Sequence, residues 1–503
     1  MLQAKNVRLT LIKDNRLIIN DFSFTAGPGE KAVIIGEEGN GKSTLLKYLY
    51  DEECVSNYVS ADGTVIRKGK YGYLPQFMPE YELCMTVSEY FSDVDIYTNY
   101  EYISDLQLDY DLLSSDQIIR TLSGGEKIKI QLLKMLCDTP DLIFFDEPSN
   151  DLDIDTLTFL ENFIKQSTIP IIFISHDETL IENTANTIIH IEQLIRKTQC
   201  KITISRQDYP TYLSSRNFQF DRQTQIAKKE RSEYRKKRER LLQLYEKAKS
   251  NSGWKNPDGI AASDGRAKKS MQSLVSKGKR FERESENFTE IPDREEGIIT
   301  RFDNSIIVPS HKKILDFSLK ELVIDGKMLS KDIVLSVVGR EHICIIGKNG
   351  VGKSTLLKAI WNTLKDREDI QVGYMPQNYQ DVLDFDKTPM EYLQSNYDKE
   401  NQSRAMTFMG NMKFTADEMM HKIGDLSGGQ KAKLIFLNMV LKKCNVLILD
   451  EPTRNFSPLS APVVRQALID FNGTIISISH DRKYLDEVAD KIYILNENGL
   501  SQL

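Results

Sequence analysis

The stretch Gly36-Glu-Glu-Gly-Asn-Gly-Lys-Ser-Thr44 follows an apolar run at 32–35 and precedes a helix-like Leu-Leu-Lys. The same pattern returns as Gly347-Lys-Asn-Gly-Val-Gly-Lys-Ser-Thr355, after a second apolar run at 343–346. A strand, a glycine-rich loop and a helix in this order are what a phosphate-binding loop needs. The glycines let backbone N–H groups and the helix N-terminus wrap around phosphates. Each copy therefore predicts a phosphate-binding loop in an α/β domain.

Three further motifs also occur twice and in the same order. Leu-Ser-Gly-Gly lies at 122–125 and 426–429, Asp-Glu-Pro at 146–148 and 450–452, and Ser-His-Asp at 175–177 and 479–481. From the serine of the first motif to the aspartate of the second is 23 positions in both halves, and from that aspartate to the histidine is 30. Chance does not reproduce four motifs at matched spacing, so the sequence predicts a duplicated domain, over 1–200 and 291–503.

The segment between the copies is strongly basic. Residues 206–283 contain 21 Lys and Arg against 9 Asp and Glu, about +12, whereas the whole chain has a net charge of −7. The remainder therefore carries about −19, and the modest total hides a segregation of charge. The pattern predicts helices over about 209–250 and 263–287, with turn residues between them. We expect an antiparallel helical hairpin over 201–290 with its tip at about 251–262.

Composition narrows the class of protein further. Hydrophobic residues make up 40% and charged residues 28%, and no apolar stretch reaches the length of a membrane helix. The N-terminus lacks the apolar region of a signal peptide. The six cysteines are scattered and form no Cys-x-x-Cys pair, which argues against disulfides or a zinc site. These features predict a soluble, cytoplasmic protein.

The repeated motifs predict two ATP sites with Mg²⁺. Each loop lysine would reach the β- and γ-phosphates, and the serine after it would meet the metal. The residues predicted to bind ATP from the loops are Gly36, Gly39, Gly41, Lys42, Ser43 and Thr44, and Gly347, Gly350, Gly352, Lys353, Ser354 and Thr355.

The other motifs supply the metal ligands and the catalytic groups. Each aspartate of Asp-Glu-Pro ends a buried-strand pattern, and Tyr-x-Pro-Gln adds a glutamine that fits the loop between the metal site and a helical subdomain. The predicted metal ligands are Ser43, Gln76, Asp146, Ser354, Gln377 and Asp450, and both glutamines are also assigned to ATP. The predicted catalytic residues, which activate water or sense the γ-phosphate, are Glu147, Glu451, His176 and His480. Alone, such a histidine would more often be a core residue and Asp-Glu-Pro a turn, but the matched spacing favours the catalytic interpretation.

Glu37 and Glu38 are an unexpected feature of the first loop, because carboxylates beside a triphosphate are repelled by it. The second loop has Lys348 and Asn349 at these positions. We expect the two glutamates to turn to solvent, or the first site to bind nucleotide less tightly.

Both halves resemble ATP-binding-cassette (ABC) ATPase domains, over about 1–195 and 315–503. In that family the Leu-Ser-Gly-Gly signature of one cassette contacts the γ-phosphate bound by the other. The resemblance therefore implies ATP-binding roles for Ser123, Gly124, Gly125, Ser427, Gly428 and Gly429. It implies that ATP joins the two halves and that hydrolysis releases them, in a monomer with an intramolecular cassette dimer.

Two departures from the family pattern stand out. The segment 8–12 lacks the aromatic residue that usually stacks on adenine, which implies loose base specificity. After Glu451 the sequence reads Pro-Thr-Arg-Asn-Phe-Ser-Pro458, whereas the first half has Pro-Ser-Asn-Asp-Leu-Asp153. Because this loop lies at the dimer seam in the family, the two sites are expected to hydrolyse ATP unequally.

Two cassettes joined by a charged helical hairpin resemble the ABC-F class, whose members act on ribosomes. A basic arm on acidic cassettes suits that partner, since RNA phosphates attract Lys and Arg. There are alternative interpretations: the basic residues could form a solvated helical face, and Trp254 could pack between the two helices. The predicted ribosome- or tRNA-binding residues are Lys228, Lys229, Arg235, Lys236, Lys237, Arg238, Trp254 and Lys255.

A narrower resemblance rests on Glu451-Pro-Thr-Arg-Asn-Phe-Ser-Pro-Leu-Ser460, which is similar to the second cassette of Lsa/Vga/Vml-type antibiotic-resistance ABC-F proteins. It implies binding of the ATP form in the E site of the 70S ribosome, near 23S rRNA, P-site tRNA and E-site proteins. It also implies protection from lincosamides, pleuromutilins and streptogramin A. The alternatives are a housekeeping translation factor of the same class and the ATPase subunit of a transporter. No membrane partner is expected, because the basic helical insert argues against a transporter subunit. No DNA partner is expected, because the zinc-binding Cys pairs of excision-repair ATPases are missing.

Overall fold

The computed structural model describes residues 1–96, 100–149, 152, 154–194, 198–251, 264–285, 288–292, 302, 308–324, 327–396 and 399–503. The chain divides into two compact units, one formed by Met1–Tyr209 with Glu295–Leu503 and the other by Pro210–Arg294. The first unit contains both copies of the duplicated domain, and the second contains most of the basic insert. Within these described ranges, no helix is long and apolar enough to cross a membrane.

The first copy is built on a six-stranded sheet in which only the last pair is antiparallel. Its strands, in spatial order, are β5 (Tyr71–Leu74), β6 (Leu142–Asp146), β7 (Ile171–Ile174), β3 (Lys31–Ile35), β8 (Thr187–Gln193) and β9 (Gln199–Ser205). An antiparallel three-stranded sheet accompanies it, in the order β2 (Leu17–Ala26), β1 (Leu2–Leu11) and β4 (Val59–Arg67).

The second copy repeats the six-stranded topology and again has one antiparallel edge. Its strands, in spatial order, are β13 (Val372–Met375), β14 (Val446–Asp450), β15 (Thr474–Ile478), β12 (His342–Ile346), β16 (Lys491–Asn496) and β17 (Gly499–Gln502). A long antiparallel hairpin takes the place of the three-stranded sheet, and it consists of β10 (Lys313–Ile324) and β11 (Lys327–Val338).

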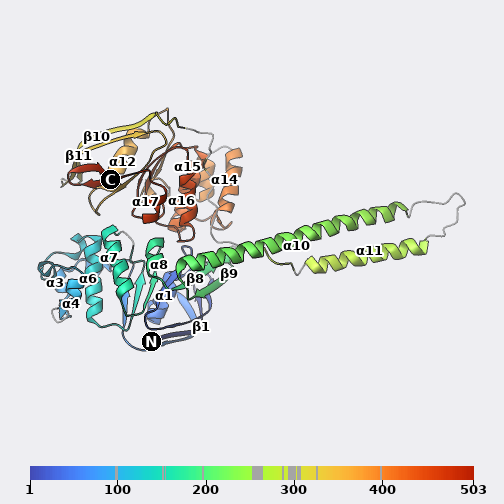
Figure 1. Cartoon of the computed structure of the whole chain (residues 1–503), viewed down its shortest axis with the longest axis horizontal. Coiled ribbons are helices and arrows are strands. Elements are labelled where there is room, and N and C mark those ends of the chain that lie inside the picture. The colour runs from blue at the N-terminus through green and yellow to red at the C-terminus, as the bar shows by residue number, and fades with distance from the viewer. Residues whose placement is uncertain are drawn as a thin grey trace. The chain divides into compact units, whose positions relative to one another are not determined.

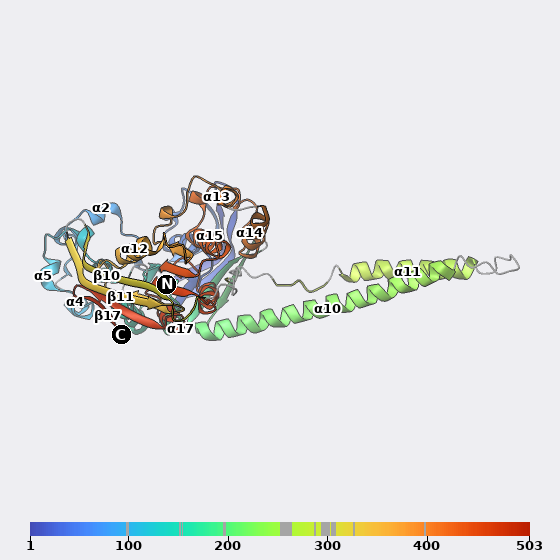
Figure 2. The same cartoon turned by 90° about the horizontal axis from the view of Figure 1, so that it is seen from above.

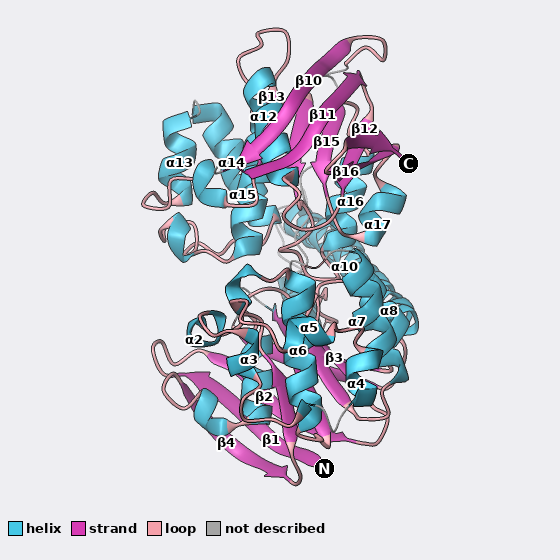
Figure 3. Ribbon diagram, turned by 90° about the vertical axis from the view of Figure 1, so that its left-hand side faces the viewer, coloured by secondary structure: helices cyan, strands magenta, loops and turns pink. Residues whose placement is uncertain are grey.

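Helices flank the strands in each copy, as Figure 3 shows. Those of the first copy are α1 (Lys42–Tyr50), α2 (Glu80–Leu83), α3 (Val87–Tyr90), α4 (Tyr100–Asp105), α5 (Tyr110–Leu113), α6 (Gly124–Cys137), α7 (Ile154–Gln166) and α8 (Glu178–Thr184), with the 3-10 turns η1 (Glu52–Cys54) and η3 (Ile119–Thr121). Those of the second are α12 (Lys353–Leu364), α13 (Pro389–Asn396), α14 (Lys399–Asn411), α15 (Gly428–Leu441), α16 (Ala461–Ile469) and α17 (Arg482–Glu487), with η4 (Tyr379–Asp381) and η5 (Ile423–Asp425).

The central strands follow from their continuous apolar runs. Every residue of the strands β3, β6 and β14 is buried, as expected for parallel strands that are covered on both faces. In each copy the strand that ends in aspartate lies parallel to the strand that leads to the histidine, with Asp146 opposite Ile174 and Asp450 opposite Ile478. The sheet therefore delivers both polar groups to the same edge. These sheets confirm the predicted tandem α/β cassettes.

The basic insert forms two long helices, α10 (Tyr209–Asn251) and α11 (Asp264–Ser285), which lie alongside each other in both Figure 1 and Figure 2. The sequence predicted helices over about 209–250 and 263–287. The segment that follows α11 contacts α10: the Tyr234 and Phe288 rings meet edge to face at 5.3 Å, and Glu230 accepts a hydrogen bond from the Thr289 amide at 2.7 Å. The predicted tip at 251–262, with Trp254 and Lys255, lies outside the described residues except for Asn251.

Candidate active sites

Each phosphate loop connects a buried strand to a helix, and several positions in the loop have a backbone conformation or a close contact that favours glycine. Gly41 and Gly352 have φ of 90° and 96° and lead directly into α1 and α12. A Cβ on Gly36 would lie 2.3 Å from the Ile191 carbonyl oxygen, and one on Gly347 would lie 2.5 Å from that of Leu495. The first turns of α1 and α12 contain no acidic residue and no side-chain cap, so their N–H groups suit an anion.

The two loop lysines are buried and fold over their own loops. Lys42 Nζ donates to the carbonyl oxygens of Gly36 and Glu37 at 2.9 and 3.1 Å. Lys353 Nζ donates to those of Gly347 and Lys348 at 2.8 and 3.0 Å. Each loop thus carries a positive charge at its centre, where a polyphosphate would meet it.

The residues predicted to hold the metal meet in pairs. Ser43 Oγ donates to Asp146 Oδ1 at 2.8 Å, and Ser354 hydrogen-bonds Asp450 in the second copy. Burial raises the pKa of both aspartates, although these hydroxyl contacts oppose the shift. A hydroxyl and a buried carboxylate side by side are oxygen donors of the kind that Mg²⁺ prefers. The arrangement therefore fits that ion.

The glutamate after each aspartate has a strained backbone. Glu147 and Glu451 have φ of 52° and 51°, in the left-handed region that non-glycine residues rarely adopt. Glu147 accepts from Gln76 Nε2 at 2.8 Å, and its Oε1 lies 3.2 Å from His176 Nε2. The sheet and this turn thus bring three of the predicted residues together.

The second copy arranges its glutamate differently. Glu451 accepts from the His480 backbone amide at 3.4 Å, and the ring nitrogen Nε2 of His480 lies 4.0 Å from Glu451 Oε1. Burial and the neighbouring Asp450 charge raise the pKa of Glu451 to about 8. Gln377 lines the cavity beside Glu451. The two catalytic clusters are consequently not equivalent.

The signature motifs form the first turns of α6 and α15, and each helix begins with a capping box. Ser123 pairs with Glu126, and Ser427 with Gln430, so that the serine hydroxyl accepts from the amide of the third helical residue. The glycines between them leave the helix N-terminus accessible at close range. Both second glycines are tightly packed: a Cβ on Gly125 would lie 2.5 Å from Thr156 Oγ1, and one on Gly429 would lie 2.6 Å from the Asn455 carbonyl oxygen.

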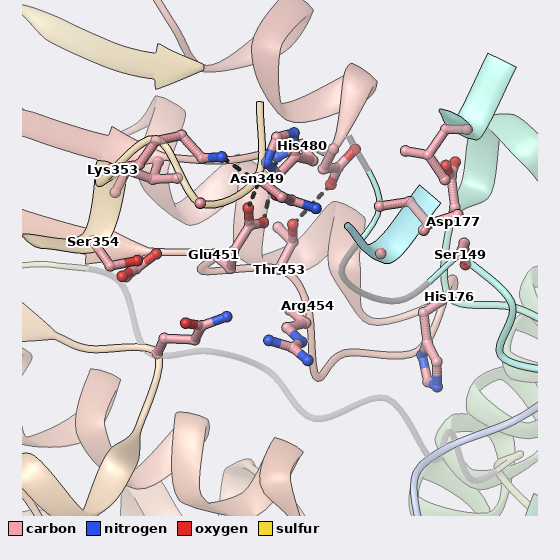
Figure 4. A pocket seen from close by; sticks show the side chains of 18 of the residues that line it. Ser149, His176, Asp177, Asn349, Lys353, Ser354, Glu451, Thr453, Arg454 and His480 are labelled. Atoms are coloured by element: carbon pink, nitrogen blue, oxygen red, sulfur yellow. Dashed lines mark hydrogen bonds and ion pairs between the residues drawn. The ribbon is translucent and has the colours of Figure 1, made fainter. Parts of the chain in front are cut away.

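Residues of both copies line the cavities at the phosphate loops. We call the loop of the first copy with the α15 N-terminus the first site, and the loop of the second copy with the α6 N-terminus the second site. A cavity of about 500 Å³ in the second site is drawn in Figure 4, where Lys353, Glu451 and His480 face Ser149 and His176 of the other copy.

The first site has a cavity of about 530 Å³ that is walled in part by Arg454 and Asn455 of the second copy. Leu11, Arg16 and Ile18 also line this cavity, and Leu11 belongs to the segment 8–12 that lacks an aromatic residue. Of the loop after Glu147, Asn150, Asp151 and Asp153 lie outside the described residues.

The expectation that Glu37 and Glu38 turn to solvent is wrong. Glu37 Oε1 accepts from Ser457 Oγ at 2.6 Å and from Ser460, both in the second copy. Glu38 Oε2 accepts from the Gly429 amide at 2.5 Å. The other copy provides enough donors to hold both carboxylates, which no property of the loop itself reveals.

Several further residues contribute to these sites although no motif predicted them. Tyr73 donates to Asp146 Oδ2 at 3.1 Å, and its repetition before the glutamine, as Tyr374, was the available signal. Lys433 is buried and lies 3.8 Å from Glu37. Arg454 lines both sites. Lys433 and Arg454 act across the two copies, so a motif within one copy could not identify them.

Comparison with known proteins places these features in context. The ABC transporter family model matches residues 19–150 and 330–454. The chain is 25% identical to ABC transporter F family member 5 of Arabidopsis thaliana, over 96% of this chain and 73% of that protein. It is 26% identical to the probable ATP-binding protein YheS of Escherichia coli K12, over 96% and 77%.

Solved structures share the fold at lower identity. The archaeal ribosome recycling factor aABCE1, in complex with the ribosomal stalk protein aP1, has a TM-score of 0.61 and 15% identity over 99% of this chain and 90% of that chain. The model of ribosome-bound archaeal Pelota and ABCE1 has a TM-score of 0.58 and 16% identity, over 99% and 78%. At this identity the likeness establishes the tandem-cassette fold.

Proposed function

The chain is an ATP-hydrolysing enzyme of the ABC transporter family, similar to F-type members over 96% of its length, and on this premise we propose that it acts on the ribosome. In its ATP-bound closed form it binds the E site of the 70S particle in the cytoplasm, and hydrolysis releases it. The observation that carries this proposal is the concentration of basic residues on the α10–α11 unit of an otherwise acidic chain.

The two sites supply the binding and the chemistry. In each, the loop glycines and lysine hold the triphosphate, and the signature serine and glycines of the other copy contact its γ-phosphate. Glu147 and Glu451 orient the attacking water, and His176 and His480 contact the γ-phosphate. The cavities support this assignment, because residues of both copies line each one.

Polar side chains hold the metal ligands and the proposed base in position before nucleotide binds. Ser43, Asp146 and Gln76, or their counterparts in the second copy, would hold Mg²⁺, which would supply positive charge to neutralise the phosphates. Gln76 also donates to Glu147, so one side chain links the metal ligands to the proposed base. The low exposure of Asp146, 1%, keeps the carboxylate away from competing water.

The basic residues of α10 are the proposed contact with RNA. The six residues predicted for this role within the described chain are exposed, namely Lys228, Lys229, Arg235, Lys236, Lys237 and Arg238. Their exposure supports contacts to phosphates of 23S rRNA or P-site tRNA. Trp254 and Lys255 remain proposed for the hairpin tip.

We further propose protection from lincosamides, pleuromutilins and streptogramin A. This part rests on the resemblance of the loop after Glu451 to resistance-type ABC-F proteins. A housekeeping translation factor is the second candidate, since the relatives reported above come from a plant and a bacterium, a breadth that favours a general role.

Ribosome co-sedimentation tests the partner. The protein with both Glu147→Gln and Glu451→Gln should pellet with 70S particles in ATP and remain in the supernatant in ADP. Replacing the six exposed basic residues of α10 by glutamine should weaken pelleting and flatten the salt dependence, by about 0.7–0.9 in log–log slope for each lost phosphate contact. A matched control replaces six exposed lysines of the cassettes: Lys5, Lys13, Lys70, Lys320, Lys331 and Lys442. Pelleting that is equal in ATP and ADP, or equally weakened by both sets, contradicts the proposal.

Drug sensitivity separates the two candidate roles. Expression in a sensitive Gram-positive host should raise the inhibitory concentration of the three drug classes, and replacing 251–262 by a short Gly/Ser turn should abolish the increase while ATPase activity remains. An unchanged inhibitory concentration with intact ribosome binding would favour the housekeeping factor.

A further inference from the structure

The first site is already joined across the two copies by carboxylates of its own loop. Glu38 Oε2 accepts from the backbone amide of Gly429 at 2.5 Å. Gly429 lies in the first turn of α15, whose N–H groups point out of the helix and favour negative charge. This is the amide that the proposed function assigns to the γ-phosphate of the first site.

The neighbouring Glu37 fixes the position of this loop. Its carboxylate accepts from Ser457 at 2.6 Å and from Ser460, and lies 3.8 Å from Lys433 Nζ. Burial opposes ionisation, but Lys433 and the two hydroxyls outweigh it and keep the pKa of Glu37 below its ordinary value. Because Lys433 belongs to α15, Glu37 holds the loop against the same helix that Glu38 contacts.

The second site has a different arrangement at the equivalent positions. Asn349 corresponds to Glu38, and its Oδ1 accepts from Lys353 Nζ of its own loop at 3.4 Å. Lys348 replaces Glu37 with the opposite charge. The loop of the second site therefore brings no carboxylate to the α6 N-terminus.

We propose that Glu38 takes the place of the γ-phosphate in the first site, so that in the closed protein this site accepts a nucleoside diphosphate and only the second site requires a triphosphate. The Gly429 amide has one N–H, and a carboxylate and a γ-phosphate at that point repel each other. A diphosphate ends one phosphate short and leaves the carboxylate in place. The proposal rests on the nucleotide-binding function of the two sites, changes the nucleotide of the closed first site from a triphosphate to a diphosphate, and is independent of the ribosomal partner.

Separate measurement of the first site tests the proposal. In a Lys353→Ala background, which disables the second site, ADP and the non-hydrolysable ATP analogue AMP-PNP are titrated calorimetrically with Mg²⁺. We expect ADP to bind at least about tenfold more tightly than AMP-PNP. Glu38→Gln keeps the shape of the side chain and removes its charge, and it should reduce that preference at least about tenfold, mainly by strengthening AMP-PNP binding. Glu53→Gln, at an exposed carboxylate outside the loop, is the matched control.

A reciprocal variant keeps the test decisive if Glu38→Gln fails to fold. Asn349→Glu in a Lys42→Ala background should shift the second site toward ADP by at least about tenfold. An ADP to AMP-PNP ratio that Glu38→Gln leaves within about twofold of its starting value overturns the proposal, and so does an unchanged ratio in the Asn349→Glu protein. Either result concerns nucleotide binding alone, so it is distinguishable from a failure to bind ribosomes.

Discussion

Arg465 of the second copy forms an ion pair with Glu178 of the first, with Nη1 2.7 Å from Oε1. Both side chains are almost fully buried, at 3% and 4% exposure. Arg465 also bonds Glu487, and Lys483 approaches Glu178 at 3.2 Å. Because Glu178 follows Ser175-His-Asp177 directly, this charged cluster connects the proposed γ-phosphate sensor of one copy to the other copy.

Arg465→Ala should loosen the contact between the copies. It leaves Glu178 buried with a weakened set of partners, a change that typically costs about 3–5 kcal/mol for a buried pair. Replacing both residues, Arg465→Met with Glu178→Leu, should cost less than the single change, because neither charge is then left buried alone. Denaturant unfolding of the single and double variants measures this. A double variant less stable than Arg465→Ala would show that the pair itself is net stabilising.

The two proposed bases should differ in their share of hydrolysis. If the first site accepts diphosphate in the closed state, Glu451→Gln should remove most of the ATPase activity and Glu147→Gln a smaller part. The double variant should retain ATP binding and lose turnover by about a hundredfold or more, the range expected for a general base. Steady-state phosphate release and ATP retention on a filter provide the two measurements. Rapid turnover in the double variant would contradict the catalytic assignment of both glutamates.

Gly429→Ala should block closure of the first site. The added Cβ would lie 2.6 Å from the Asn455 carbonyl oxygen, and that atom belongs to the backbone and cannot turn away. Asn455 belongs to the same copy as Gly429, so the N-terminus of α15 would have to shift, and the Gly429 amide would no longer meet Glu38 of the first copy. We expect ATPase activity to fall by about tenfold or more as a result. Gly410→Ala in α14 is the control, since nothing lies within 4 Å of its Cβ. That change should leave activity intact and raise stability by about 0.5–1 kcal/mol. Equal activity of the two variants would contradict the prediction.

His342 should make the second copy sensitive to acid. Burial lowers the pKa of this histidine below 6.5, although Asp490 and nearby carbonyl groups, including that of Val488, oppose the shift. Below pH 6.5 the unfolded chain then binds a proton that the folded chain refuses, so the free energy of unfolding falls as the pH drops. The slope is at most about 1.4 kcal/mol per pH unit.

Unfolding by denaturant between pH 5 and pH 7.5 measures this sensitivity. His342→Gln removes the titrating group and should flatten the profile, whereas the exposed His421→Gln should leave it unchanged. An identical acid slope in the wild type and His342→Gln would assign the sensitivity to other groups.

Much of the architecture could be predicted from local pattern. The buried runs before Asp146 and Asp450 read as parallel strands, because such strands are apolar on both faces. The long insert read as a helical pair from its periodicity and its turn residues. The serine of each signature motif, followed three residues later by Glu126 or Gln430, indicates a helix start. These signals lie within a few residues of one another, where propensity and hydrogen bonding decide the structure.

The sequence by itself determined the duplicated cassettes, the phosphate loops and the segregation of charge, since each depends on residue type and spacing along the chain. Only the tertiary structure decided where Glu37 and Glu38 point. Their partners, Lys433, Ser457 and Gly429, are almost 400 residues or more away and become neighbours only when one copy packs on the other. Carboxylates that are unfavourable beside phosphate are stable here, because a helix N-terminus meets Glu38 and because a lysine and two hydroxyls meet Glu37. That environment is a property of the assembled interface, which no local pattern contains.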